Sequence, residues 1–459
     1  MDLINKYFLG EITDDEFINQ SSSKEEAIEF LKNIDEFRSK TYNSGVKIGL
    51  NVEKFNHILK NIITLTQKLN ELKDIPNKEN LIFLINQNEV KKLYTQLEEF
   101  IPKDIPLDIQ VGNISNYFEN NINHFSSIEI EEYNIFKDFK IDKLNRINIF
   151  AGFNNSGKTT LLEAIYLLVN QNNMSSFFNV IKHRNKLDSL NTLFLNDYFN
   201  NDISISGEFN DIKTNIFIKK FEAKIDKKND YLNSYQIVST IDTNVLDNTV
   251  HTFKNNPIQR YYDKIEVLCS SLYKSPYFHN HQEVINTHSK SIELKVFGLV
   301  VDFIRDKIDK NIDKIEFTDK DNIKRFLVDS KSFPEKSVNI ATYGEGLQRI
   351  FEIALSFAYC QNGVLLIDEL ETAIHYSLLI DFTKFIQELA RKFNVQVFLT
   401  SHSKECINAF VENGFRDDDI SAYFLENENN NVEALQVNEK KLKHYIESVN
   451  FDLRGTNNG

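Results

Sequence analysis

Two patterns of hydrophobic and polar residues divide this chain. In residues 1–101, apolar side chains recur three or four positions apart, for example at Phe30, Ile34 and Phe37. This spacing places them on one face of a helix. We therefore predict an N-terminal α-helical domain over residues 1–101, followed by a linker over residues 102–127 that begins with two closely spaced prolines.

A different organisation begins at residue 128. Residues 128–140 alternate apolar and polar side chains, as a half-buried strand and its turn do. We predict that residues 128–459 form a second domain with an insertion of about residues 180–338. The insertion combines strand-like alternation in residues 202–209, 214–221 and 235–240 with helix-like spacing in residues 291–308 and 322–328.

One short apolar run, Ile147–Phe150, leads into Gly152-Phe-Asn-Asn-Ser-Gly-Lys-Thr159 and then into a helical pattern. This matches G-x-x-x-x-G-K-[ST] in the strand–loop–helix setting of a phosphate-binding P-loop. The backbone N–H groups of such a loop face one anion, the lysine reaches the β- and γ-phosphates, and the hydroxyl after it binds Mg²⁺. We expect ATP and Mg²⁺ as cofactors, with Mg²⁺ on Thr159 and the nucleotide on Gly152, Asn154, Asn155, Ser156, Gly157, Lys158, Thr159 and Thr160.

A second apolar run, Gly363–Glu369 (GVLLIDE), ends in two carboxylates. Parallel strands deliver the residues at their carboxyl ends to one edge of a sheet, so this run would place both acids beside the P-loop. We expect Asp368 to hold Mg²⁺ through its water shell and Glu369 to polarise the attacking water as the general base. Together with the P-loop, these residues predict a Mg²⁺-dependent ATPase.

A glycine-rich segment, Tyr343–Arg349, precedes a strongly apolar helix, Ile350–Tyr359. Glycines at the start of a helix form an anion site. A second phosphate site is redundant within one subunit unless it faces the nucleotide of another subunit. We therefore expect Gly344, Glu345 and Gly346 to contact ATP across a subunit interface.

In their order along the chain, the P-loop, Gly344–Gly346, Leu365–Glu371 and Ser401–Ser403 resemble the ABC-type ATPase head. They resemble more closely the AAA-family ATPases related to OLD proteins. The resemblance covers residues 127–454. It implies an α/β fold, namely a P-loop NTPase head of the ABC type with a mixed sheet, an antiparallel β-subdomain and a helical lobe, preceded here by the α-helical domain.

The resemblance also implies roles at a subunit interface. Two heads would enclose the nucleotide as a homodimer or higher homo-oligomer, and His402 would be a catalytic residue in contact with the γ-phosphate. Glu371–Ser377 would be the D-loop that crosses the interface. No glutamine fits the family's Q-loop. Gly344 stands where transporters have serine, so backbone N–H groups would make that phosphate contact.

OLD nucleases continue after the head into a Toprim nuclease domain, whereas this chain ends at Gly459, and we expect it to lack that domain. The resemblance implies an ATP-dependent switch that controls a separate nuclease-like or toxin-like effector in bacterial anti-phage defence. Two alternatives stay open: a DNA-binding repair or maintenance ATPase similar to RecF or SMC heads, and the nucleotide-binding subunit of a transporter. The chain has no long heptad pattern, which weighs against the first, and its N-terminal segment weighs against the second.

Composition adds three expectations. Asp and Glu outnumber Lys and Arg by 67 to 53, a net charge of −14, so nucleic-acid binding is possible but not indicated. We interpret the basic cluster in residues 182–186 as a solvated helix end. The three cysteines have no metal-site or disulfide spacing, and no run of about 18 apolar residues occurs, so we expect buried thiols in a cytoplasmic protein without a membrane segment.

Overall fold

The computed structural model describes residues 14–20, 24, 114–118, 124–185, 201–222, 231–253, 259–261, 265–277, 281–320, 323–413, 419–428 and 431–437. The expected N-terminal domain and linker fall mainly outside these residues. Before residue 124, the described residues include the helix α2 (Asp14–Gln20) and the strand β1 (Ile114–Asn116). The division into a front domain, a linker and a second domain remains a prediction.

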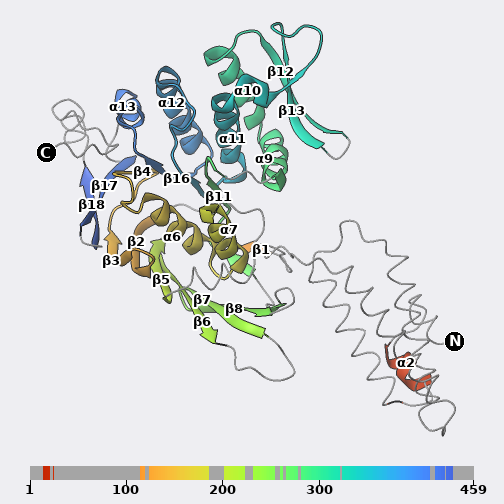
Figure 1. The fold of residues 1–459 in the computed structure, drawn as a ribbon, viewed down its shortest axis with the longest axis vertical. Helices are drawn as coiled ribbons and strands as arrows, with labels where there is room; N and C mark the ends of the chain where they lie inside the picture. The colour runs from red at the N-terminus through yellow and green to blue at the C-terminus, as the bar shows by residue number, and fades with distance from the viewer. Residues whose placement is uncertain are drawn as a thin grey trace, which may run out of the picture.

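A six-stranded sheet forms the centre of the molecule (Figure 1). In spatial order its strands are β11 (Ser271–Lys274), β15 (Val364–Ile367), β16 (Gln396–Ser401), β4 (Ile147–Gly152), β17 (Ile420–Glu428) and β18 (Asn431–Val437). The first five are parallel, and β18 is antiparallel to β17. Every residue of β4, β15 and β16 is buried, because a parallel sheet is covered on both faces. The buried strands expected from the apolar runs are confirmed.

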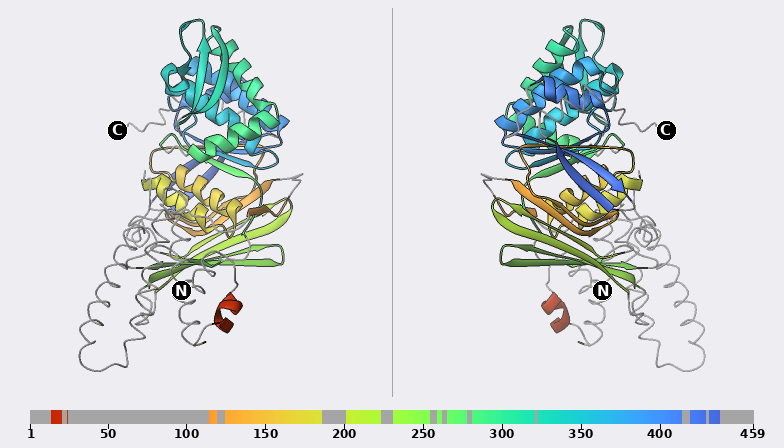
Figure 2. Two further views of the ribbon diagram at one scale, coloured as in Figure 1. Left: turned by 90° about the vertical axis from the view of Figure 1, so that its right-hand side faces the viewer. Right: turned by 90° about the vertical axis from the view of Figure 1, so that its left-hand side faces the viewer.

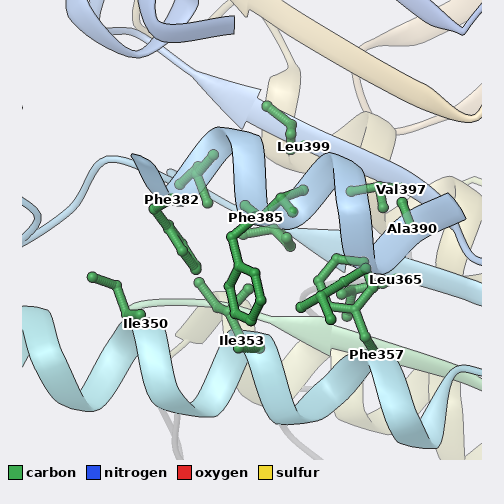
Figure 3. Close-up of a cluster of buried hydrophobic side chains, with 14 of the residues drawn as sticks. Ile350, Ile353, Phe357, Leu365, Phe382, Phe385, Ala390, Val397 and Leu399 are labelled. Carbon is green, nitrogen blue, oxygen red and sulfur yellow. The ribbon is translucent and has the colours of Figure 1, made fainter. Parts of the chain in front are cut away.

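Helices cover one face of this sheet. They are α9 (His281–Glu293), α10 (Val296–Lys307), α11 (Glu345–Tyr359), α12 (Tyr376–Lys392) and α13 (Lys404–Glu412). Apolar residues at helical spacing on α11 and α12, such as Ile350, Ile353 and Phe382, pack with alternate residues of β15 and β16, including Leu365 and Leu399 (Figure 3). Burying one large apolar side chain contributes roughly 1.5–3 kcal/mol, so this layer holds both helices on the sheet.

The opposite face carries α6 (Lys158–Asn170) and α7 (Met174–Asn185), which lie between the core sheet and a seven-stranded antiparallel sheet (Figure 2). The strands predicted in residues 202–209, 214–221 and 235–240 are confirmed within this second sheet. In spatial order it contains β3 (Phe136–Ile141), β2 (Phe125–Tyr133), β5 (Ile203–Phe209), β6 (Ile212–Glu222), β7 (Tyr231–Ile241), β8 (Asn244–Phe253) and β9 (Gln259–Tyr261). A short strand, β10 (Ile265–Val267), pairs in parallel with β1.

One expectation for the helical lobe is wrong. Residues 322–328 belong to β13 (Ile323–Ser330), which pairs antiparallel with β12 (Ile312–Lys320). The adjacent apolar residues Phe326, Leu327 and Val328 allow a helical spacing, but Phe326 and Val328 alone are buried, which is the period-two pattern of a strand. Two short elements, β14 (Val338–Asn339) and the 3-10 helix η1 (Ile340–Tyr343), then lead into α11.

The expected fold class is confirmed. The chain forms an α/β fold with a P-loop between β4 and α6, a mixed core sheet, an antiparallel β-subdomain and a helical lobe. The carboxyl ends of β4, β15 and β16 lie at one edge of the core sheet. The P-loop, Asp368 and His402 follow these three strands, so the sheet itself gathers the predicted site.

The structure also bears on two expectations from composition, namely buried thiols and the absence of a membrane segment. Cys269, Cys360 and Cys406 are buried and free of disulfides. In the segments that the structure describes, no helix is both long and apolar enough to cross a bilayer.

Candidate active site

The loop after β4 lies at the middle of the sheet edge and ends where α6 begins. Gly157 adopts a φ of 94°, and a Cβ there would lie 2.8 Å from Ile135 Cδ1 and 2.9 Å from Phe136 Cζ, so this position requires glycine. No side chain caps the first N–H groups of α6. Among the described residues, nothing hydrogen-bonds to the buried hydroxyl of Ser156. The loop thus presents unsatisfied polar groups at a helix N-terminus, which is an arrangement that binds phosphate.

Lys158, the first residue of α6, folds back over this loop. Its Nζ donates to the backbone oxygens of Gly152 at 2.9 Å and Phe153 at 2.7 Å. Burial lowers the pKa of the Lys158 ammonium, and nearby carboxylates, Asp368 foremost, oppose this change. An ammonium held by neutral carbonyls can exchange these contacts for stronger ones to phosphate oxygens.

Asp368 follows β15 and is 3% exposed. Thr159 donates to its carboxylate, with 3.2 Å to Oδ1 and 3.0 Å to Oδ2, and Thr400 donates to Oδ1 at 2.6 Å. Thr400 belongs to β16, the strand between β15 and β4. Burial raises the pKa of Asp368, whereas the hydrogen bonds from Thr400 and Thr159 oppose the rise. The two Mg²⁺ ligands expected from the sequence are therefore in contact.

The pair formed by Thr159 and Asp368 fits Mg²⁺ by its chemistry. This ion prefers oxygen ligands and keeps several water molecules, so one or two protein carboxylates beside substrate phosphates suffice. A hydroxyl and a carboxylate already lie together here. A cation would also offset the cost of burying the charge of Asp368.

Glu369 has a φ of 49°, a left-handed conformation that is uncommon for glutamate. Its backbone N–H donates to Thr400 Oγ1 at 2.8 Å. Its carboxylate Oε2 accepts hydrogen bonds from Tyr277 at 2.9 Å and from Thr372 at 3.1 Å. Hydrogen bonds therefore fix both the backbone and the carboxylate of the expected general base.

The glycine segment that opens α11 packs on Ala373, within the predicted D-loop of the same chain. A Cβ on Gly346 would lie 2.3 Å from the backbone oxygen of Ala373, so only glycine permits this approach. Gly344 and Glu345 are exposed, and no side chain caps the helix at Gly344. Of the three residues expected to meet a second subunit, two face solvent, and Gly346 is used in internal packing.

The same helix contacts the end of β15. Arg349 Nη2 donates to the backbone oxygens of Asp368 at 2.6 Å and Glu369 at 2.9 Å. Burial lowers the pKa of the Arg349 guanidinium, and Asp368 opposes this change most strongly. Through Arg349, α11 therefore connects the glycine segment to the backbone at the two expected carboxylates.

His402 follows β16 and contacts the D-loop, Glu371–Ser377. Its backbone N–H donates to Glu371 Oε1 at 3.0 Å, and its Nδ1 lies 3.6 Å from the same oxygen. At the other end of the D-loop, the His375 side chain accepts a hydrogen bond from the N–H of Ser377 and caps α12. The assignment of His402 to the γ-phosphate remains a prediction.

The interpretation of the basic cluster on α7 as a solvated helix end is wrong. Lys182 is buried, and Arg184 forms an ion pair with Glu163, a fully buried residue of α6. Arg184 Nη2 also donates to Thr160 Oγ1 at 2.9 Å. Burial raises the pKa of Glu163, and Arg184 opposes this rise. The cluster therefore packs against the P-loop helix, and its arginine compensates a buried charge.

Sequence reasoning missed three residues of this site: Thr400, Arg349 and Tyr277. Thr400 ends an apolar strand beside the Ser401–Ser403 motif, which could have indicated it. Arg349 lies three residues after Gly346, so the two lie on the same face of a helix. This spacing could have indicated Arg349 from the sequence. Tyr277 gave no local signal, because its contact with Glu369 joins positions 92 residues apart.

Comparison with known proteins gives matches over the same region. A family model described as "AAA domain, putative AbiEii toxin, Type IV TA system" matches residues 147–408, more than half of the chain. An ATP/GTP phosphatase of Helicobacter pylori is 24% identical over 325 residues, which span 61% of this chain and 86% of that protein. An uncharacterised protein of Methanocaldococcus jannaschii is 30% identical over 113 residues, which span 24% of this chain and 99% of that protein.

Solved structures of SMC heads also align with the chain. The SMC head domain from Thermotoga maritima is 11% identical at a TM-score of 0.34 and covers 69% of this chain and 99% of its own. An SMC head bound to the C-winged helix domain of ScpA is 11% identical at a TM-score of 0.38, with the same coverage of 69% and 99%.

Proposed function

The chain belongs to the AAA-domain family whose model matches residues 147–408, and from this premise we propose that it is a Mg²⁺-dependent ATP-hydrolysing switch that dimerises around ATP and controls a separate effector. The family makes the chain an AAA-type ATPase. One observation carries the step to hydrolysis: Thr159 touches Asp368 at 3.0 Å, and Glu369 is the next residue. These are a metal-binding pair and a base on one sheet edge.

The residues divide between holding the nucleotide and activating water. The N–H groups of the loop, the Ser156 hydroxyl and the Lys158 ammonium bind the phosphates. When bound, Mg²⁺ is held by Thr159 and Asp368 and offsets the charge on the phosphate oxygens. Glu369 accepts the proton of the attacking water, and the hydrogen bond from its backbone N–H to Thr400 Oγ1 fixes its main chain.

Dimerisation is supported by the start of α11. Its first N–H groups have no side-chain cap, and Gly344 and Glu345 are exposed. An uncapped helix N-terminus on the surface attracts an anion, and the γ-phosphate in the P-loop of a second subunit is such an anion. Each ATP would then lie between one subunit's P-loop and the other subunit's Gly344.

We propose a separate effector because an ATPase cycle needs a binding partner to act on. Such a cycle acts on other molecules only where the ATP-bound and ATP-free states bind them differently. The family description names a putative toxin and a TA system, which supports a role in a system of that kind, and within it we propose a separate toxin-like or nuclease-like effector. We place this switch in bacterial anti-phage defence in the cytoplasm, with residues 1–101 as the part that contacts the effector.

Mixing two inactive variants tests the composite site. Lys158→Ala removes the P-loop cation. Gly344→Asp places a carboxylate at the exposed start of α11, where a Cβ meets no atom within 4 Å but strains the backbone, because Gly344 has a φ of 95°. We expect each variant alone to lack hydrolysis and the mixture to recover it, because mixed dimers contain one intact site. A mixture of Lys158→Ala with the double variant is the control and should stay inactive. Mixed dimers that form without any recovery would refute the composite site.

The defence role is tested in cells that express the full chain with its neighbouring genes. Plating of phage should fall in cells with the parent protein and should return to the empty-vector level with Lys158→Ala. Protection by Lys158→Ala equal to that of the parent would show that ATP binding does not control the effector.

A further inference from the structure

The segment that leaves β11 for the helical lobe reaches the catalytic carboxylate. Lys274, the last residue of β11, accepts a hydrogen bond from the N–H of Asp368 at 2.8 Å. Three residues later, Tyr277 is 50% exposed and donates its hydroxyl to Glu369 Oε2 at 2.9 Å. Lys274 Nζ also forms an ion pair with Glu283 of α9. One short segment therefore connects the end of β15, the base and the helical lobe.

The hydrogen bonds at the Glu369 carboxylate are arranged unevenly. Tyr277 and Thr372 both donate to Oε2, from the segment after β11 and from the D-loop respectively. Within the described residues, Oε1 accepts no hydrogen bond from the chain. A carboxylate held through one oxygen in this way presents the other oxygen to an incoming water molecule, which is the geometry that a general base needs.

We propose that Tyr277 is a positioning residue for Glu369: its hydroxyl holds Oε2 so that Oε1 can take the proton of the attacking water. The hydrogen bond to Glu369 raises the pKa of the Tyr277 hydroxyl, which therefore remains a donor at neutral pH. This inference rests on the proposed role of Glu369 in hydrolysis.

The substitution Tyr277→Phe tests it, because it deletes one hydroxyl and keeps the ring. The variant loses a hydrogen bond to the charged carboxylate of Glu369, and we expect kcat for ATP hydrolysis to fall about tenfold. The KM and the Kd for ATP should stay within about twofold, because the deleted hydroxyl donates to the base and the P-loop groups proposed to bind the phosphates are unchanged. Tyr117→Phe is the matched control: it deletes a hydroxyl that accepts a hydrogen bond from Asn244 at 2.9 Å, and it should leave kcat unchanged.

A double-variant measurement separates positioning from a structural role. In single-turnover assays, Tyr277→Phe should cause no further loss on the Glu369→Gln background, because the group that it orients no longer acts as a base. An equal, independent loss on both backgrounds would overturn the inference, as would a drop in ATP affinity or thermal stability that accompanies the drop in kcat. Unchanged kcat in Tyr277→Phe with an active parent would overturn it and leave the proposed function intact. A parent that hydrolyses no ATP would overturn both.

Discussion

The Thr159 hydroxyl lies 3.0 Å from Asp368 Oδ2, although 209 residues separate them along the chain. The contact arises because β4 and β15 end at the same edge of the core sheet with β16 between them. Thr400 of β16 donates to the same carboxylate at 2.6 Å. Asp368 after β15, Thr400 at the end of β16 and Thr159 after β4 therefore meet at one place. Single side chains at this edge can be changed without removing the buried strands that support it.

Lys158→Ala should weaken ATP binding and leave the fold intact. Each charge-assisted hydrogen bond to phosphate contributes roughly 1.5–3 kcal/mol, so we expect a loss of affinity of about 10- to 100-fold. Calorimetric titration with ATP and Mg²⁺ measures it. Lys384→Ala removes an exposed lysine of α12 and is the control. Equal affinities of Lys158→Ala and the parent would refute the P-loop assignment.

Gly346→Ala should disturb the D-loop of the subunit that carries it. The added Cβ would lie 2.3 Å from the backbone oxygen of Ala373, so either the helix or the D-loop must shift. Forcing an extra methyl group into such packing costs roughly 1–3 kcal/mol, and we expect a lower thermal midpoint together with slower hydrolysis.

Gly298→Ala in α10 is the matched substitution. A Cβ at Gly298 meets no atom within 4 Å, and alanine is favoured over glycine within a helix by roughly 0.5–1 kcal/mol. Differential scanning calorimetry should show an unchanged or raised midpoint for Gly298→Ala and normal hydrolysis. A Gly346→Ala protein as stable and active as Gly298→Ala would contradict the packing described at Ala373.

The stability of the protein should fall in mild acid, in part because of His183. Burial and the neighbouring charges of Lys182 and Lys274 lower the pKa of His183 to about 4. Between about pH 6.5 and pH 4 the unfolded chain binds a proton at this position that the folded chain does not, so stability decreases as the pH falls through this range.

His183→Phe should make this pH dependence smaller. Phenylalanine keeps a ring where His183 stacks on Tyr273 at 5.3 Å, but it cannot bind a proton. We expect the urea midpoint to fall less between about pH 7 and about pH 5 than it does in the parent. Part of the fall should persist, because burial also lowers the pKa of His124 to about 4. Identical pH profiles for the two proteins would exclude a contribution from His183.

The sequence predicted those parts of the site that are local. The P-loop and the acids after β15 each combine a fully buried strand with a fixed spacing of functional groups, so apolar runs and motif positions located them. The strand at β13 was mistaken for a helix, because three adjacent apolar residues, Phe326–Val328, fit both periods. Only pairing with β12 decides between them.

Other features of the site depend on the three-dimensional fold. Tyr277 and Arg349 reach Glu369 only because β11 pairs with β15 and α11 lies over the sheet. The ion pair of Arg184 with Glu163 likewise requires α7 to fold back along α6. In the sequence, the residues of α7 look like a basic surface, and only their burial shows that they compensate a carboxylate.

Glu369→Gln tests the central claim of ATP hydrolysis by a dimerising head most directly. Glutamine keeps the size of the side chain but is a far weaker base, whereas Thr159, Asp368 and Lys158 remain in place. Phosphate release and light scattering should be measured together, with ATP and Mg²⁺, on the full chain. We predict that the parent releases phosphate, and that Glu369→Gln binds ATP, releases phosphate at least about 100-fold more slowly and accumulates as a stable dimer. Undiminished phosphate release by Glu369→Gln, or a variant that stays monomeric with ATP while the parent dimerises, would contradict the account.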